Sequence, residues 1–449
     1  MKEYLLAFFC VVLFSEKAFA QDHQHHHQED SVSHTMQESN NELSASNAVP
    51  MSHAFSRNLP MNRNASGTSW LPDSSPMFGY MKHSPNWMFM MHGNVFFRYN
   101  NQDVANSGSR GGDNFDVPNW FMGMGQTNVG SRGLFRFSTM ISLEPLTVGG
   151  EGYPLLFQSG ETWNNAPLVD RQHPHDFFSE LSVAYSHVLS NDADVFAYLA
   201  YPGEPAFGPA AFMHRVSGIY NPDASLGHHW QDATHITFGV TTLGFRYKNI
   251  KLDGSVFTGR EPDENRYDFD KPRFDSWSAR VSYNPTSDLS LQFSKAWVSD
   301  VHEFGPREDV NKTTASALHS LRLNSSSVIS SAIIWGYNNP REHHSASNSV
   351  LLESAITLNK LSVYTRYEWV EKSTEDLLLD EPEFGHGALF PINSVTLGVQ
   401  QSLFEERNTD VSIGAQAAWY KTPSELREVY GGNPLAFQIY LRISPLKMN

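Results

Sequence analysis

The most regular feature of this chain is a strict alternation of apolar and polar positions. It begins at Trp87, where Trp87, Phe89, Met91, Val95, Phe97 and Tyr99 alternate with Met88, Met90, His92, Asn94, Phe96 and Arg98. A period of two indicates β-strand. The same pattern returns in residues 133–144 and again in residues 435–444. The chain is therefore expected to be all-β from residue 87 onward.

Sixteen segments of this kind follow one another. They cover residues 87–99, 118–128, 133–144, 177–189, 193–202, 234–248, 250–259, 274–284, 288–299, 314–324, 327–337, 349–358, 361–371, 393–404, 409–420 and 435–444. Their connections alternate between tight turns and long loops, as in outer-membrane barrels. A soluble propeller or sandwich has no reason for such alternation. We predict a transmembrane antiparallel β-barrel of about 16 strands (14 is the other count considered) over residues 87–449, with the long loops at the cell surface.

The first twenty residues have the pattern of a cleaved signal peptide. Lys2 precedes an apolar run, Leu5–Phe14, and Ala18-Phe19-Ala20 forms a small-x-small cleavage site. The single cysteine, Cys10, lies within this run. We therefore predict an exported, cysteine-free mature protein located in the cell outer membrane.

Residues 21–86 form a His- and Met-rich N-terminal segment. Polar residues dominate its first half, and such a composition buries too little apolar surface to offset the entropy of ordering. We expect residues 21–64 to be disordered and the segment to be largely so, while the more aromatic stretch 68–80 docks onto the barrel.

Charge and motifs narrow the partners. The chain has 32 basic and 48 acidic residues, a net charge of -16, which excludes a nucleic-acid binder. The expected partners are outer-membrane lipid and lipopolysaccharide, the barrel-assembly machinery and a small solute or metal ion, and a homo-oligomer is compatible with the fold. No hydrolase elbow, zinc-protease or phosphate-loop motif occurs, so we expect no enzyme.

Three consecutive long loops carry histidines and carboxylates. The histidines and the aspartate that could act as ligands are His173, His175, His228, His229, Asp232 and His235, with His214 in the same loops. These loops leave the same end of the barrel and can converge. Imidazole with carboxylate suits a divalent transition metal such as Zn²⁺, Ni²⁺ or Cu²⁺. A hydrogen-bonded polar plug is the alternative interpretation.

Methionines are concentrated in the first third of the chain. Twelve of the 14 lie at or before Met140, and the alternation places Met88, Met90 and His92 in the lumen. Thioethers prefer Cu(I) and imidazoles suit Cu(II), so these residues, together with His23, His25, His26 and His27, predict copper binding. Methionine is also a common filler of irregular gaps, which is the alternative. No cofactor is required.

Several longer motifs resemble a family of exported bacterial outer-membrane β-barrel proteins of unassigned function. They are Thr68-Ser69-Trp70-Leu71-Pro72-Asp73, Asn119-Trp120-Phe121-Met122-Gly123-Met124, Leu143-Glu144-Pro145-Leu146-Thr147, the run Leu168 to Asp176, Gly227-His228-His229-Trp230-Gln231-Asp232 and Gly259-Arg260-Glu261-Pro262-Asp263. The resemblance covers about residues 68–300 and implies no activity. In layout, but not in aligned motifs, the chain is similar to outer-membrane copper-resistance proteins with a His/Met-rich tail.

These observations predict a porin-like outer-membrane channel or transporter for a small solute, with a metal cation such as copper as the more specific hypothesis. A plugged barrel with a structural or surface-interaction role is the alternative. An outer-membrane hydrolase, with His175 or His235 acting beside Asp176 or Asp232, is a further one.

Overall fold

The computed structural model describes residues 51–301, 308–341 and 345–448, all of which belong to one compact unit, Asn47–Asn449. The predicted signal peptide and residues 21–50 of the predicted tail lie outside the described residues. Among the described residues, no helix is long and apolar enough to cross a membrane.

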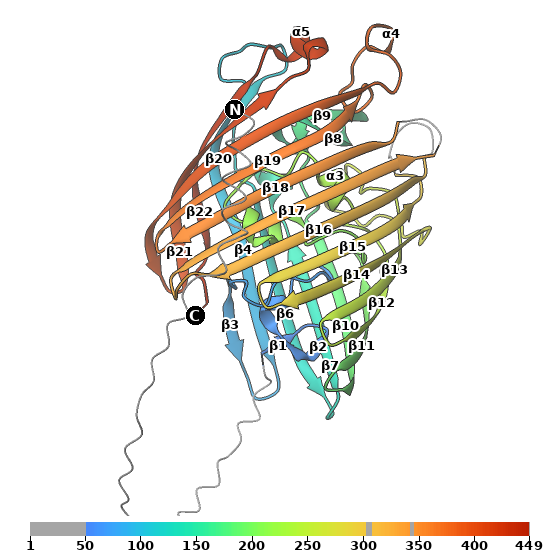
Figure 1. Cartoon of the computed structure of the whole chain (residues 1–449), viewed down its shortest axis with the longest axis vertical. Coiled ribbons are helices and arrows are strands. Elements are labelled where there is room, and N and C mark those ends of the chain that lie inside the picture. Colours follow the sequence, from blue (N-terminus) through green and yellow to red (C-terminus); the bar gives the residue numbers. More distant parts are fainter. Residues whose placement is uncertain (1–50, 302–307, 342–344, 449) are drawn as a thin grey trace, which may run out of the picture. The chain divides into compact units, whose positions relative to one another are not determined.

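A closed antiparallel barrel of 16 through-going strands makes up most of the unit (Figure 1). The strands are β4 (Met88–Gln102), β6 (Asn119–Val129), β7 (Gly133–Ile141), β10 (Phe178–Ser190), β11 (Ala193–Ala200), β12 (Val240–Tyr247), β13 (Ile250–Phe257), β14 (Ser276–Thr286), β15 (Leu289–Val298), β16 (Val310–Arg322), β17 (Ser327–Pro340), β18 (Ser347–Leu358), β19 (Leu361–Ser373), β20 (Leu389–Glu406), β21 (Thr409–Lys421) and β22 (Leu435–Pro445). The predicted fold class and strand number are confirmed.

The first and last strands close the ring. β22 pairs with the second half of β4, from Phe437 opposite Asn101 to Ile443 opposite Val95. The first half of β4 pairs on that side with a short strand, β3 (Tyr80–His83). On the opposite side of β4, the short strand β5 (Gly112–Asp116) pairs with the second half, from Arg98 to Gln102. With the edge strands joined, the backbone groups of the barrel find partners around the ring, as a lipid environment requires.

Alternate residues of the strands face opposite environments. On β22, Ile439, Leu441 and Ile443 are exposed, whereas Tyr440 and Arg442 are each 2% exposed. The same alternation of exposed and buried positions runs through β4, β13 and β20, although the buried positions of β4 include the apolar residues Met88, Met90 and Phe96. An apolar outer face and a polar inner face are the pattern of a transmembrane barrel.

The N-terminal segment 51–78 fills part of the lumen, and we call it the plug. It contains β1 (Ser52–His53), β2 (Ser56–Pro60) and the short 3-10 helix η1 (Met61–Arg63), drawn in blue inside the ring of strands in Figure 1. The expectation of disorder is therefore wrong for residues 51–64. The composition gave no sign of this order, because the apolar partners of the plug belong to the barrel wall rather than to the plug itself.

Plug and wall are joined by both apolar and charged contacts. The Phe55 ring lies 4.9 Å from that of Phe196. Thr68 Oγ1 donates to Asp253 (2.7 Å) and accepts from Arg280 (2.6 Å). The plug lies near the tight turns, because Asn58 donates to the main chain of Ser190. Such contacts supply the burial that a short segment cannot provide alone.

Long loops fill the lumen from the other end. The loop after β7 contains α2 (Glu144–Thr147) and a hairpin of β8 (Tyr153–Trp163) and β9 (Ala166–Gln172). The loop after β11 contains η2 (Phe212–His214), η3 (Val216–Gly218) and α3 (His228–Gln231), and smaller helices lie in later loops: α4 (Glu381–Phe384), η4 (Ser424–Leu426) and α5 (Arg427–Tyr430). The expected strand 234–248 begins only at Val240, because Gly239 turns the chain at φ +100°. His235 therefore belongs to the inward loop.

Candidate functional site

Five loop histidines come together inside the barrel, as the sequence predicts. His173 and His175 follow β9, His228 and His229 begin α3, and His235 follows α3. We call these five residues the histidine cluster. Ring nitrogens of His173, His228 and His229 lie within 4.8 Å of one another, and so do ligand atoms of His228, Asp232 and His235. His228 belongs to both groups and is 1% exposed.

Most of these imidazoles are fixed through one nitrogen, while the other has no partner. His175 Nδ1 lies 2.7 Å from Glu144, and His229 Nδ1 lies 2.9 Å from Glu261. Their Nε2 atoms are buried and unpartnered among the described residues. Metal-ligating histidines typically donate the other ring N–H to a carboxylate or carbonyl in this way.

His235 and His173 follow the same rule from opposite ring atoms. His235 Nδ1 donates to the main-chain oxygen of Asp232 at 2.8 Å, which leaves Nε2 as the lone-pair nitrogen. In His173 it is Nε2 that contacts Glu161 (3.1 Å), and Nδ1 has no partner in the described part of the chain. These four histidines and His228 line a cavity of ≈ 10 Å³, room for one water or ion.

Electrostatics keep most of the cluster neutral. Burial, with the neighbouring charge of Arg266, holds the pKa of His173 well below its usual range, and burial lowers the pKa of His235 to about 3. His175 differs from His173 and His235: burial opposes its protonation, but Glu144 outweighs burial and raises its pKa. Neutral imidazole is the form that binds metals.

The backbone beside the cluster is adapted to close approach. Gly160 has φ +118°, and a Cβ at this position would lie 2.3 Å from His229 Nε2. Glu161, the next residue, also has a positive φ of 57°. A non-glycine residue in this region costs about 1–3 kcal/mol. The strain places the Glu161 carboxylate beside His173, so the hairpin β8–β9 is shaped to bring both residues to the cluster.

A vestibule leads from the long-loop end to the cluster. Its volume is ≈ 420 Å³, and its lining contains six carboxylates, from Glu161, Glu261, Glu308, Glu375, Asp376 and Glu381. Lys312 is the one Lys or Arg among the described lining residues. Glu161, His229 and Glu261 line both the vestibule and the small cavity. A predominantly acidic approach raises the local concentration of cations.

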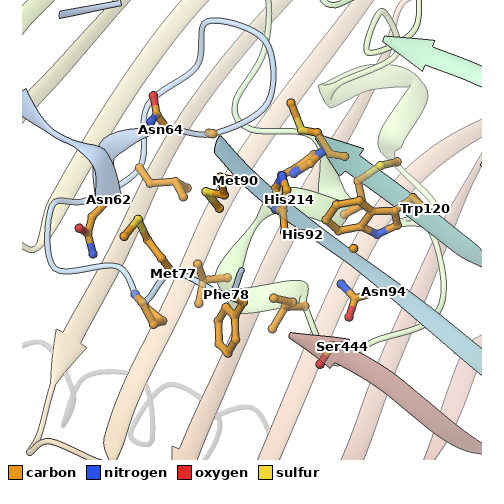
Figure 2. A pocket seen from close by; sticks show the side chains of 18 of the residues that line it. Asn62, Asn64, Met77, Phe78, Met90, His92, Asn94, Trp120, His214 and Ser444 are labelled. Carbon is orange, nitrogen blue, oxygen red and sulfur yellow. The ribbon is translucent and has the colours of Figure 1, made fainter. Parts of the chain in front are cut away.

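The predicted residues of the first strands lie elsewhere. Met88, Met90 and His92 face the lumen, as the alternation predicts, and line up with methionines of β6: Met90 is opposite Met124, and His92 is opposite Met122. Met90 and His92 belong to a second pocket, described below, that also includes His214 (Figure 2). Met88 is buried among the neighbouring methionines but does not line this pocket. His214 therefore does not join the loop cluster, although its loop does. His23, His25, His26 and His27 lie outside the described residues.

Some residues of these sites carried no recognisable signal. Glu144 and Glu161 orient His175 and His173, but neither stands at a metal-ligand spacing from its partner in the sequence. Met61 joins the second pocket from the stretch expected to be disordered, and Met77 joins it from the stretch 68–80 that was expected to dock onto the barrel. Only their type, in a chain whose methionines are concentrated near the N-terminus, could have pointed to them.

Comparison with protein-family models and with curated proteins finds no match. Among solved structures, the chain is similar to Salmonella typhi OmpF in complex with daunomycin, with a TM-score of 0.51, 8% identity, and coverage of 81% of this chain and 100% of that one. An anion-selective porin from Comamonas acidovorans has a TM-score of 0.48 at 12% identity, covering 80% of this chain and 99% of that one. The likeness to OmpF supports the porin-type barrel fold alone.

Proposed function

We propose that this protein is an outer-membrane barrel that binds a divalent transition-metal cation at the histidine cluster and passes it through the lumen. One observation carries the proposal: four imidazoles that line a shared cavity each have one nitrogen held by a carboxylate or carbonyl, while the other nitrogen is buried and unpartnered among the described residues. Packing alone gives no reason for this repeated arrangement, because each unpartnered buried nitrogen costs about 1–3 kcal/mol.

The filled lumen favours a cation over a larger solute. Plug and loops leave a vestibule of ≈ 420 Å³ above a cavity of only ≈ 10 Å³. A cation that exchanges its water shell for imidazole nitrogens fits this constriction, whereas an organic solute requires the loops to move. Imidazole with carboxylate suits Zn²⁺, Ni²⁺ or Cu²⁺, and the porin-type fold supplies the passage across the membrane.

The test compares metal binding by matched variants of the full-length protein. His228→Ala removes the residue shared by both ligand groups. His187→Ala removes a histidine of β10 whose ring contacts Tyr185 (6.3 Å) rather than the cluster. Every variant keeps the N-terminal histidines, so differences report the cluster. We expect Zn²⁺ or Cu²⁺ titration to show at least one fewer bound ion in His228→Ala, with His187→Ala equal to wild type.

Flux separates transport from storage. Protein reconstituted in vesicles that contain a zinc indicator should admit Zn²⁺, and His228→Ala should reduce the rate. Equal metal binding by wild type and His228→Ala would show that the histidine cluster is a hydrogen-bonded polar filling of the lumen and not a metal site. Binding without flux would support the plugged structural barrel instead.

A further inference from the structure

A second pocket in the lumen differs in chemistry from the histidine cluster. Its volume is ≈ 80 Å³, and we call it the methionine pocket. Six methionines line it: Met61, Met77, Met90, Met122, Met124 and Met213. His92, His214 and Trp120 also line this pocket, and Figure 2 shows these three side chains grouped beside Met90. The lumen of a transmembrane barrel is usually polar, so a thioether-lined chamber requires a separate explanation.

Four separate parts of the chain supply the methionines and histidines of this pocket. The plug provides Met61 and Met77, β4 provides Met90 and His92, and β6 provides Met122 and Met124. The three-residue helix η2 provides Met213 and His214. Because strand pairing places Met90 opposite Met124 and His92 opposite Met122, the sulfur atoms and imidazole come from neighbouring inner-face positions.

The aromatic rings of the methionine pocket lie close together, and one imidazole has a nitrogen without a hydrogen-bond partner that could bind a metal. The ring of His92 lies 5.6 Å from that of His214 and 5.2 Å from that of Trp120. Trp120 and His214 are 4.7 Å apart. His92 Nε2 is buried and has no partner in the described residues. A tryptophan face beside the imidazoles adds cation–π attraction for a bound cation.

The charge of the lining selects the kind of cation. No Asp or Glu occurs among the described residues that line the methionine pocket, and its one Lys or Arg is Arg442. A divalent ion here would lack the anionic partners that a buried charge needs. Neutral thioether and imidazole ligands instead suit a soft monovalent ion.

Gap filling is the competing explanation for these methionines. A filler packs its site shut, whereas this site retains ≈ 80 Å³ together with an unpartnered imidazole nitrogen. We propose that the methionine pocket is a second metal site, selective for Cu(I) and Ag(I), and that the plug completes it with Met61 and Met77. This inference is independent of the proposed function, since either site can bind its ion without the other.

The experiment uses Ag⁺, which needs no reductant, and replacements that conserve side-chain volume. The double variant Met90→Leu/Met124→Leu nearly conserves the side-chain volume and packing but removes two thioether groups. Met91→Leu is the matched control, because Met91 is the next residue of β4 and is 63% exposed on the outer face. All variants retain the same N-terminal segment, so its methionines and histidines contribute equally.

Loss of an outer-shell partner typically lowers metal affinity about 10–100-fold. Because the double variant loses two direct ligands, we expect calorimetry on the full-length protein to show a reduction in Ag⁺ affinity at this site that is at least as large. Met91→Leu should match wild type. X-ray absorption of the Cu(I)-loaded protein should show sulfur ligands that decrease in the double variant. His228→Ala should keep Ag⁺ binding while losing Zn²⁺, which separates this inference from the proposed function. Unchanged Ag⁺ binding in the double variant, or a spectrum with nitrogen and oxygen ligands only, would overturn the inference.

Discussion

One buried hydroxyl group of the plug bonds to two charged residues of the barrel wall. Thr68 is 0% exposed, and its Oγ1 links the plug to Asp253 (2.7 Å) and Arg280 (2.6 Å) on the barrel wall. Thr68→Val keeps the shape and removes both hydrogen bonds. In this variant Asp253 and Arg280 still pair with each other at 2.8 Å, so neither charge is left without a partner. Each lost hydrogen bond should therefore cost about 1.5 kcal/mol of docking free energy, the low end for bonds to charged groups.

The resulting loss of about 3 kcal/mol corresponds to about 150-fold in the docking equilibrium. Arg63 reports this equilibrium, because it is 2% exposed and bound to Asp73 while the plug is docked. When opening is fast relative to cleavage, proteolysis follows the population of the open form. Trypsin should therefore cleave after Arg63 about 150-fold faster in Thr68→Val, as followed by mass spectrometry.

Thr68→Ser is the control, because it retains the hydroxyl group and should stay within a few-fold of wild type. If Thr68→Val is cleaved after Arg63 as slowly as wild type, the two hydrogen bonds do not hold the plug. The remaining contacts between plug and wall, such as that of Phe55 with Phe196 and that of Asn58 with Ser190, would then account for docking.

Two further predictions concern pH and membrane orientation. Burial raises the pKa of Glu204 from 4.5 to about 8, so the stabilisation that the protonated carboxyl group provides should be full below about pH 4.5 and be lost as the pH rises to about 8. Glu204→Gln should lack up to about 5 kcal/mol of that fall, measured as the difference in unfolding free energy between the two proteins across pH, and equal slopes would contradict the prediction. If the long loops face the cell exterior, an impermeant thiol reagent on whole cells should label Asp268→Cys, which lies in the long loop after β13. The reagent should not label Asp192→Cys, which lies in the tight turn between β10 and β11. The reverse labelling would invert the topology.

Local alternation was sufficient to predict the barrel but not its contents. A lipid-facing residue such as Leu441 and a lumen-facing residue such as Arg442 are neighbours in sequence, so a period of two identifies the strand directly. Phe55 has no such local signal, because its ring packs on Phe196, far along the chain. Order in the plug depends on these long-range contacts, which composition does not report.

The site was predictable in part for the same reason. Loops that leave one end of a barrel can meet, and His173, His175, His228, His229 and His235 do meet. The partition of the histidines was not predictable, because it depends on how the loop after β11 turns inside the lumen. One short helix, η2, places His214 in the methionine pocket while its neighbour Phe212 reaches the histidine cluster.

Phe212 lies between the two sites, and its position bears on how an ion could pass from one to the other. Its ring lies 6.1 Å from His175, 6.0 Å from His228 and 5.9 Å from His235, and it also packs against the methionines. A divalent ion that left the carboxylate-rich cluster past this ring would enter a pocket without described carboxylates and near Arg442. Its electrostatic stabilisation would fall sharply in a low-dielectric lumen. If both proposals hold, the two sites therefore discriminate by charge as well as by ligand softness, and Zn²⁺ retained at the histidine cluster should not displace Ag⁺ from the methionine pocket.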